Sequence, residues 1–232
     1  MAIQNNPGQM PGPGTARVSD TRVVVKSDAS YLPEGLIIDG SGSRDPLNTS
    51  YVDYLRPGLL MGRITATGLF RPSIYGVLSV AYTTGGSGTS MTVSAATAVE
   101  LNRNASSGTF TITGPPTAAG TVVSTTITYS AVNTSSGVIT ISATAANYIA
   151  GSFIGPVDGS QTPVSMIGNG QPIKVTDALS ASIDVEWEKP LQGGTLDSSQ
   201  IINYPSDTSL ITWVEDQLQE RGLYVFDAKY KV

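Results

Sequence analysis

The stretch LRPGLLMGRITATGLFRPS at residues 55–73 carries the pattern that decides the fold class. Pro57-Gly58 and Thr67-Gly68 are turn signals, because proline presets one turn position and glycine tolerates the positive φ that another requires. A run of Leu, Met and Ile lies between the two turns, and Leu69-Phe70 follows the second. We therefore predict two strands joined by tight turns, within a mainly β protein.

The segments on either side of this pair also favour strands and turns. On the N-terminal side lie RVVVK (22–26) and YLPEGLIIDGSGSRD (31–45), the second of which contains a Gly/Ser turn. On the C-terminal side, GPVDGSQTPVSMIGNGQPIKV (155–175) has the same composition, and SASIDVEWEKP (180–190) alternates apolar with acidic residues. Alternation with a period of two is typical of a half-buried strand.

One segment near the end of the chain has the period of a helix. In SDTSLITWVEDQLQERG (206–222), the residues Leu210, Val214 and Leu218 recur every four positions, which predicts an amphipathic helix. Trp213 lies on the adjoining row, where it is either a core residue or an anchor for a partner, since buried tryptophans are common at interfaces. The sequence LYVFDAKYKV that follows predicts a final strand.

The composition changes sharply between residues 85 and 150. This stretch contains only two charged residues, Glu100 and Arg103, and it opens with the glycine-rich segment GGSGTS. A short helix is predicted at 94–104, where the spacing of Thr97 and Glu100 resembles a capping box.

Three strands follow this helix in the sequence. They are GTFTITG (108–114), TVVSTTITYSA (121–131) and GVITISA (137–143), and NTSSG between the last two predicts a hairpin loop. We expect one Thr/Ser face and one apolar face, the latter formed by Phe110, Ile112, Val123, Ile127, Tyr129, Ile139 and Ile141.

These patterns divide the chain into three parts. We expect a flexible N-terminal arm (1–16), a discontinuous β-rich body (17–84 and 151–232) and an inserted, outward-facing β module (85–150). The predicted fold class is mainly β: a small barrel-like or sandwich-like body, an inserted small β module with a short helix, and one C-terminal amphipathic helix.

The composition argues against several classes of function. The chain has no Cys and no His, so Ser-His-Asp and Cys-His catalysis and ordinary zinc sites are not expected. The net charge is −5 and no Lys/Arg cluster occurs, so we expect no nucleic-acid partner. No apolar run is long enough to span a membrane, and no signal peptide is apparent, which favours synthesis and folding in the cytoplasm. We predict no catalytic residue, metal, cofactor or small-molecule substrate.

Two acidic patterns were weighed as sites. Asp184, Glu186 and Glu188 share one strand face; the solvated face of an ordinary strand is the first interpretation, and ion pairing between subunits or metal binding and catalysis are the alternatives. The segment from Asp39 to Asp45 begins like a calcium loop, but it lacks the glycine and the glutamate that such a loop requires, so we predict a plain turn.

Residues 1–16 carry no charged side chain and are rich in Pro, Gly, Gln and Asn. Such a segment cannot bury enough apolar surface to order itself. It is either a loose leader or an arm that becomes ordered on a neighbouring subunit. Our predicted partner contacts are Ile3, Met10, Arg17, Arg22 and Trp213.

Two separated pieces of the sequence together resemble a known family. The stretch 55–73, followed later by DGSQTPVSMIG (158–168), resembles the lambda-type head-decoration (cement) proteins of tailed bacteriophages. The matching pieces are Gly58, Gly62, Ile64–Gly68, Leu69-Phe70, Asp158–Ser160, Pro163 and Met166-Ile167. The stretch 85–150 resembles a Ser/Thr/Ala-rich module that recurs in phage virion proteins.

The resemblance implies a structural role in the virion. It implies a protein that sits as a homotrimer on the outer surface of the capsid and clamps neighbouring major capsid subunits. Its partners would be the major capsid protein and further copies of itself.

Other functions stay open on the sequence alone. The first alternative is a fibre-like or receptor-binding virion protein, in which the inserted module contacts the host surface. A secreted adhesin and a hydrolase with paired carboxylates are the remaining ones.

Overall fold

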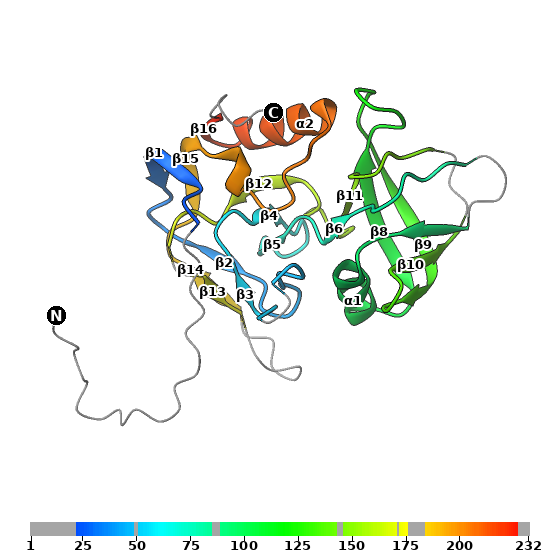
Figure 1. Ribbon diagram of the computed structural model, residues 1–232. Coiled ribbons are helices and arrows are strands. Elements are labelled where there is room, and N and C mark those ends of the chain that lie inside the picture. Colours follow the sequence, from blue (N-terminus) through cyan, green and yellow to red (C-terminus); the bar gives the residue numbers. More distant parts are fainter. Residues whose placement is uncertain are drawn as a thin grey trace, which may run out of the picture.

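The computed structural model has two lobes that lie side by side (Figure 1). It describes residues 22–48, 51–84, 89–142, 146–170, 172–175 and 184–226. Strands make up most of the regular structure in this part of the chain, with two α-helices, which confirms the predicted mainly β class.

The first lobe, called the body below, is built around a five-stranded sheet in the order β12-β4-β5-β2-β14. Its strands are β2 (Leu36–Ile38), β4 (Leu60–Arg63), β5 (Phe70–Pro72), β12 (Pro163–Met166) and β14 (Val185–Trp187). β4 and β5 are antiparallel, with Met61 opposite Pro72, so the hairpin predicted within 55–73 is confirmed. β12 returns beside β4 after the whole second lobe, with Met166 opposite Leu60.

A three-stranded sheet and a helix complete most of the body. The sheet order is β1-β15-β16, with β1 (Val25–Tyr31) antiparallel and β16 (Leu223–Phe226) parallel to β15 (Leu191–Leu196). β1 begins three residues later than the strand predicted at 22–26. A two-stranded sheet pairs β3 (Tyr54–Leu55) with β13 (Ile173–Lys174), and a 3₁₀ turn, η1, covers Ser198–Gln200.

The predicted C-terminal helix is confirmed as α2 (Thr208–Gln219). Asp207 caps it, since one carboxylate oxygen accepts from the backbone N–H groups of Ser209 and Leu210. The face formed by Leu210, Val214 and Leu218 is buried against the body core, as the period of four indicates.

The second lobe is a strongly curled six-stranded sheet in the order β6-β11-β8-β9-β10-β7. Its strands are β6 (Gly76–Val77), β7 (Ser90–Thr92), β8 (Gly108–Gly114), β9 (Val123–Asn133), β10 (Val138–Ile141) and β11 (Phe153–Gly155). A bridge between Leu78 and Val93 brings the two edges of this sheet together. The three predicted strands are confirmed, but their sheet also includes β6 and β11, whose residues lie outside 85–150.

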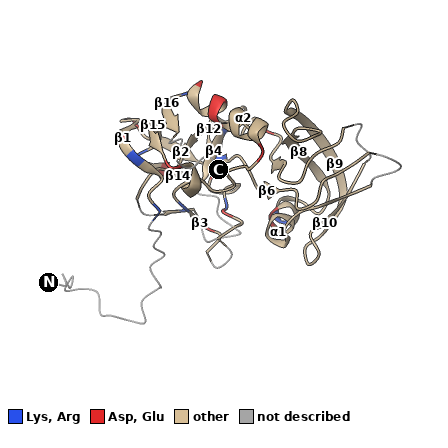
Figure 2. Ribbon diagram, turned by 45° about the horizontal axis from the view of Figure 1, so that its top comes forward, with Lys and Arg blue, Asp and Glu red and all other residues tan. Residues whose placement is uncertain are grey.

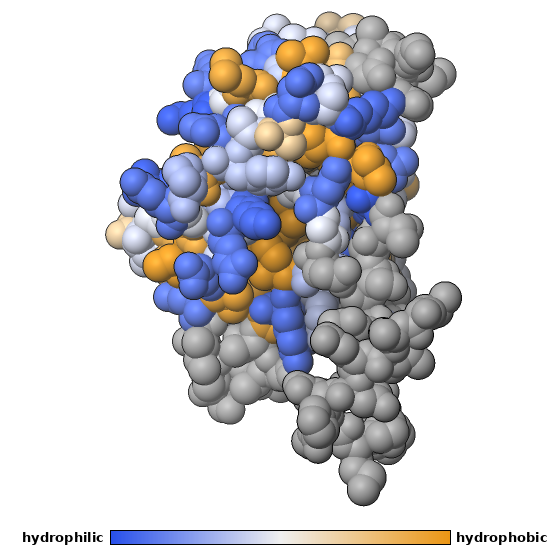
Figure 3. All heavy atoms as spheres, turned by 90° about the vertical axis from the view of Figure 1, so that its left-hand side faces the viewer, coloured by the Kyte–Doolittle hydropathy of each residue, from blue (hydrophilic) through white to orange (hydrophobic). Residues whose placement is uncertain are grey.

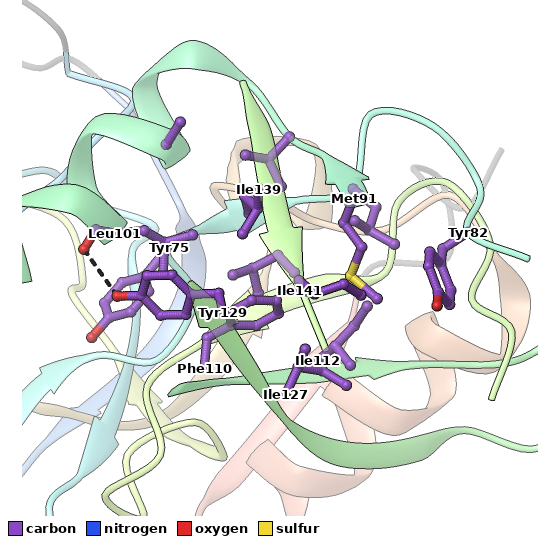
Figure 4. Packing of buried hydrophobic residues seen from close by; sticks show 14 of the residues in the cluster. Tyr75, Tyr82, Met91, Leu101, Phe110, Ile112, Ile127, Tyr129, Ile139 and Ile141 are labelled. Atoms are coloured by element: carbon purple, nitrogen blue, oxygen red, sulfur yellow. Dashed lines mark hydrogen bonds between the residues drawn. The ribbon is translucent and has the colours of Figure 1, made fainter. Parts of the chain in front are cut away.

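The helix α1 (Ala95–Asn104) covers the apolar face of this sheet, as predicted for 94–104. Its cap is Ser94, whose hydroxyl accepts from the N–H of Thr97; the predicted capping box at Thr97 and Glu100 was therefore wrong by one turn. Figure 4 shows aromatic and aliphatic side chains of the sheet pointing toward one another beneath α1, where the Tyr129 hydroxyl donates to the carbonyl of Leu101.

The apolar face of the predicted strands is confirmed except at one position. Phe110, Ile112, Ile127, Tyr129, Ile139 and Ile141 are all buried. Val123, at the start of β9, is 36% exposed, because it lies at the end of the strand pair, opposite Gly114. The Thr face is only partly exposed: Thr111 and Thr113 are buried.

Candidate interaction surfaces

The residues predicted to contact partners are only partly described by the structure. Ile3, Met10 and Arg17 lie outside the described residues. Arg22 is the first described residue and is half-buried. Trp213 is half-buried against the body core, with its ring 6.0 Å from that of Phe153 in β11. Trp213 therefore lies where the two lobes meet.

β11 belongs to both lobes through neighbouring side chains. Phe153 is part of the body core, whereas Ile154, the next residue, is part of the core of the second lobe. Adjacent side chains of a strand point to opposite faces, so one short strand serves both cores. The glycine-rich segment at 85–90 thus does not separate the lobes, because β11 joins them elsewhere.

The two charged residues of the stretch 85–150 lie at this junction. Figure 2 shows the second lobe almost without charged residues except on α1. The Arg103 guanidinium pairs with the buried carboxylate of Glu100 and also donates to the carbonyls of Ser41 and Gly42 in the body, both at 3.3 Å. Sequence analysis noted the isolation of these two charges but not this role.

The same body loop answers the question of the calcium-like pattern. The Asp39 carboxylate accepts from the Ser41 N–H and hydroxyl at 3.0 and 2.7 Å, and from the Gly42 N–H at 3.1 Å. Among the described residues, no group of three or more Asp or Glu side chains is arranged to hold a metal ion. These contacts are those of a turn, as predicted, and the turn presents its carbonyls to Arg103.

A second contact between the lobes involves the cap of α2. While one oxygen of Asp207 caps the helix, the other accepts from the Ala119 N–H of the second lobe at 3.0 Å. Ala119 has a φ of 54°, a conformation that a non-glycine residue adopts only when its surroundings hold it.

Buried charge also fixes the body loop beside the junction. Arg56 and Asp45 form two hydrogen bonds, at 2.5 and 3.0 Å, and the Asp45 side chain is fully buried. Burial, followed by the nearby Arg103 charge, lowers the pKa of Arg44 below its ordinary value. Arg44 donates to the carbonyls of Gly40 and Ser43, so this loop is held by side chains along its length.

The acidic residues of β14 face the solvent. Asp184, Glu186 and Glu188 are exposed, whereas Trp187 between them is 2% exposed and contacts Phe70. One Asp184 oxygen accepts from the Gly40 N–H at 3.3 Å. This arrangement matches the solvated-face interpretation, and ion pairing between subunits stays a prediction.

Three open grooves lie along this side of the body. The first, of about 570 Å³, has an apolar floor that includes Leu36 and Phe70, with Arg63 and Arg221 among its lining residues. The second, of about 680 Å³, continues past Leu36 and Arg63 to the β14 carboxylates, and the third, of about 450 Å³, lies beside Trp187. Small-molecule sites usually bury roughly 70–90% of their ligand. Grooves this open fit an extended macromolecular contact better.

Both ends of the described chain lie at one end of the three-stranded sheet. Val25 is opposite Leu196, and Leu196 is opposite Phe226, so residues 1–21 and 227–232 join the body at the same end. Figure 3 views the molecule from the side on which β1 lies in Figure 1, and its hydrophobic residues form separate spots among hydrophilic ones. Leu223 and Val225 of β16 are 83% and 59% exposed.

Comparison with known proteins adds no relative. A scan against protein-family models, a search of the curated proteins and a search of the solved structures each found no match. Of the helices in the described part of the chain, none is long and apolar enough to cross a membrane.

Proposed function

We propose that this chain is a structural virion protein that decorates and stabilises the outer surface of a bacteriophage capsid. It would clamp neighbouring major capsid subunits and act as a homo-oligomer, for which the sequence resemblance implies a trimer. One observation carries the proposal most: the two separated pieces of sequence that resemble decoration proteins fold into a single unit, β4-β5 with β12 beside β4.

The glycines and polar residues of this unit have specific packing roles. A Cβ on Gly62 would lie 1.8 Å from the carbonyl oxygen of Ser160, so only glycine lets the two pieces approach. The Thr65 N–H donates to the Asp158 carbonyl at 2.8 Å. The residues that carry the resemblance are therefore those that the strand unit requires, which supports reading the pattern as structural.

The rest of the molecule suits a role that depends on contact area. Specific protein contacts bury on the order of 1,200–2,000 Å², and repetition over a lattice turns weak contacts into lasting ones. Such a protein needs a rigid body and surface, and no reacting group. The junction formed by β11, Arg103 and Asp207 supplies the rigidity.

Binding to capsids tests this proposal. Purified chain is mixed with capsids that lack it, bound protein is separated by sedimentation, and the bound amount is measured as the added amount rises. We expect saturation at a fixed number of copies per capsid and a higher temperature of capsid disruption. Absence of capsid binding, together with saturable binding to host cells, would instead support the receptor-binding alternative.

A further inference from the structure

Exposed sheet edges are usually protected, and most edges of this protein follow the rule. An unprotected edge offers unpaired N–H and C=O groups to other chains. β1 is irregular, with register shifts along its pairing to β15 and a φ of 56° at Asp28, and β14 carries exposed carboxylates. The six-stranded sheet brings its own edges together through Leu78 and Val93.

β16 lacks these protections. Its four residues, Leu223–Phe226, include no charge and no proline, and its pairing to β15 has no register shift. In the described part of the chain no strand lies on its outer side. Leu223 and Val225 point outward, whereas the Tyr224 ring is buried and its hydroxyl donates to the Leu191 carbonyl. The strand is therefore anchored from within and open at its edge, apart from the Tyr224 carbonyl, which accepts from Gln219 at 3.3 Å.

We propose that the free edge of β16 receives residues 2–6 of a second copy of this chain as an added strand. This inference rests on the proposed function, because it names a contact between copies in the assembly. Residues 1–6 contain no proline, whereas prolines follow at 7, 11 and 13, and a strand added to an edge must donate its N–H groups. The segment and β16 are both uncharged, so pairing them desolvates no charge.

The geometry favours a second copy over the same chain. Residues 1–21 join β1 at the end of the sheet where β16 finishes, as the pairings of Leu196 with Val25 and Phe226 show. To reach its own β16 edge, the segment would have to reverse direction where residues 227–232 leave that strand. Residues 7–21, if extended, span up to roughly 45–50 Å at about 3.1–3.3 Å per residue. That reach is sufficient for a neighbouring copy.

Disulfide trapping tests the contact directly, because the natural chain has no cysteine. Residues 2–5 are changed to cysteine one at a time, and each variant is mixed with Val225→Cys and oxidised. Side chains of a strand alternate between two faces. We therefore expect efficient cross-linked heterodimers at every second position only. The matched control is Val80→Cys on the second lobe, which has the same exposure of 59% and should give at least a tenfold lower yield.

Three results would overturn the inference. They are equal yields with Val225→Cys and Val80→Cys, yields that do not alternate along residues 2–5, and a disulfide that forms only within one chain when Ile3→Cys and Val225→Cys are combined. Capsid binding of the chain lacking residues 2–6 is measured in parallel. If cross-linking fails while the full chain still saturates capsids, only this inference falls; if cross-linking is specific while capsids stay bare, the proposed function falls.

Discussion

At the scale of single residues, close backbone approaches decide which side chains are possible. Gly62 in β4 lies against the Ser160 backbone, whereas a Cβ on Gly108 would meet nothing closer than the Tyr129 hydroxyl at 3.5 Å. The two glycines thus differ in the one property that a methyl group tests.

We predict that Gly62→Ala destabilises the protein by about 1–3 kcal/mol, as overpacking usually does, and that Gly108→Ala changes stability by well under about 1 kcal/mol. Chemical denaturation of both variants and the natural chain measures the free energies of unfolding. Equal stability of the two variants would show that the close approach at Gly62 is not needed.

The buried tyrosine of β16 makes a prediction about alkaline pH. Burial raises the pKa of Tyr224 from 10.0 to about 12. Between these values the unfolded chain loses the phenol proton while the folded chain keeps it, so the free energy of unfolding falls as pH rises. Below pH 10 this group has no such effect.

We therefore expect stability to decline from about pH 10 to about pH 12, and to decline less steeply in Tyr224→Phe. The variant also loses the hydrogen bond to the Leu191 carbonyl, so it should be less stable than the natural chain at neutral pH. Parallel pH slopes for the two proteins would contradict the account of this tyrosine.

At the scale of elements, the cap of α2 has two roles that a pair of substitutions separates. Asp207→Ala removes both the cap and the acceptor for Ala119, and should cost about 0.5–2 kcal/mol. Asp207→Asn keeps one oxygen for the cap but places an amide donor opposite the Ala119 N–H. We expect a smaller loss for asparagine, measured by thermal unfolding. If asparagine costs as much as alanine, the contact with the second lobe dominates over the cap.

Elements with a strong local pattern could be predicted from the sequence, whereas those held by distant partners could not. The period of α2, the turns around β4 and β5, and the alternation in β8–β10 are local signals, and all were confirmed. β15 reads LQGGTL, whose glycines argue against a strand; it forms because β1 and β16 pair on either side of it. The cap of α1 was misplaced because Ser94 and Thr97 both precede plausible partners.

The same distinction applies to the interaction surfaces. The solvent-facing carboxylates of β14 follow from alternation within one strand. The contact of Arg103 with the loop at Ser41 and Gly42 joins residues about sixty positions apart, and no local pattern predicts it. The unprotected edge of β16 depends on the order of strands in a sheet, which the sequence alone does not reveal.

At the scale of the whole molecule, the two lobes should unfold together. Both tryptophans of the chain lie in the body, so their fluorescence reports on that lobe, while hydrogen exchange of β9 reports on the other. Because β11 contributes to both cores, we expect one midpoint of denaturation by the two measurements. Phe153→Ala should lower both midpoints together, with a loss of about 3–5 kcal/mol. Separate midpoints in the natural chain would mean that the junction does not couple the lobes.

The proposed function treats this rigid molecule as a repeated part of a shell, and an electron cryomicroscopy map of particles that contain the chain tests this most directly. The account predicts density that fits both lobes on the outer capsid surface, at every equivalent lattice position, with the body against capsid subunits and the second lobe directed to solvent. Density for the chain only at the tail or in fibres, or second lobes buried against the capsid while the body faces solvent, would contradict it.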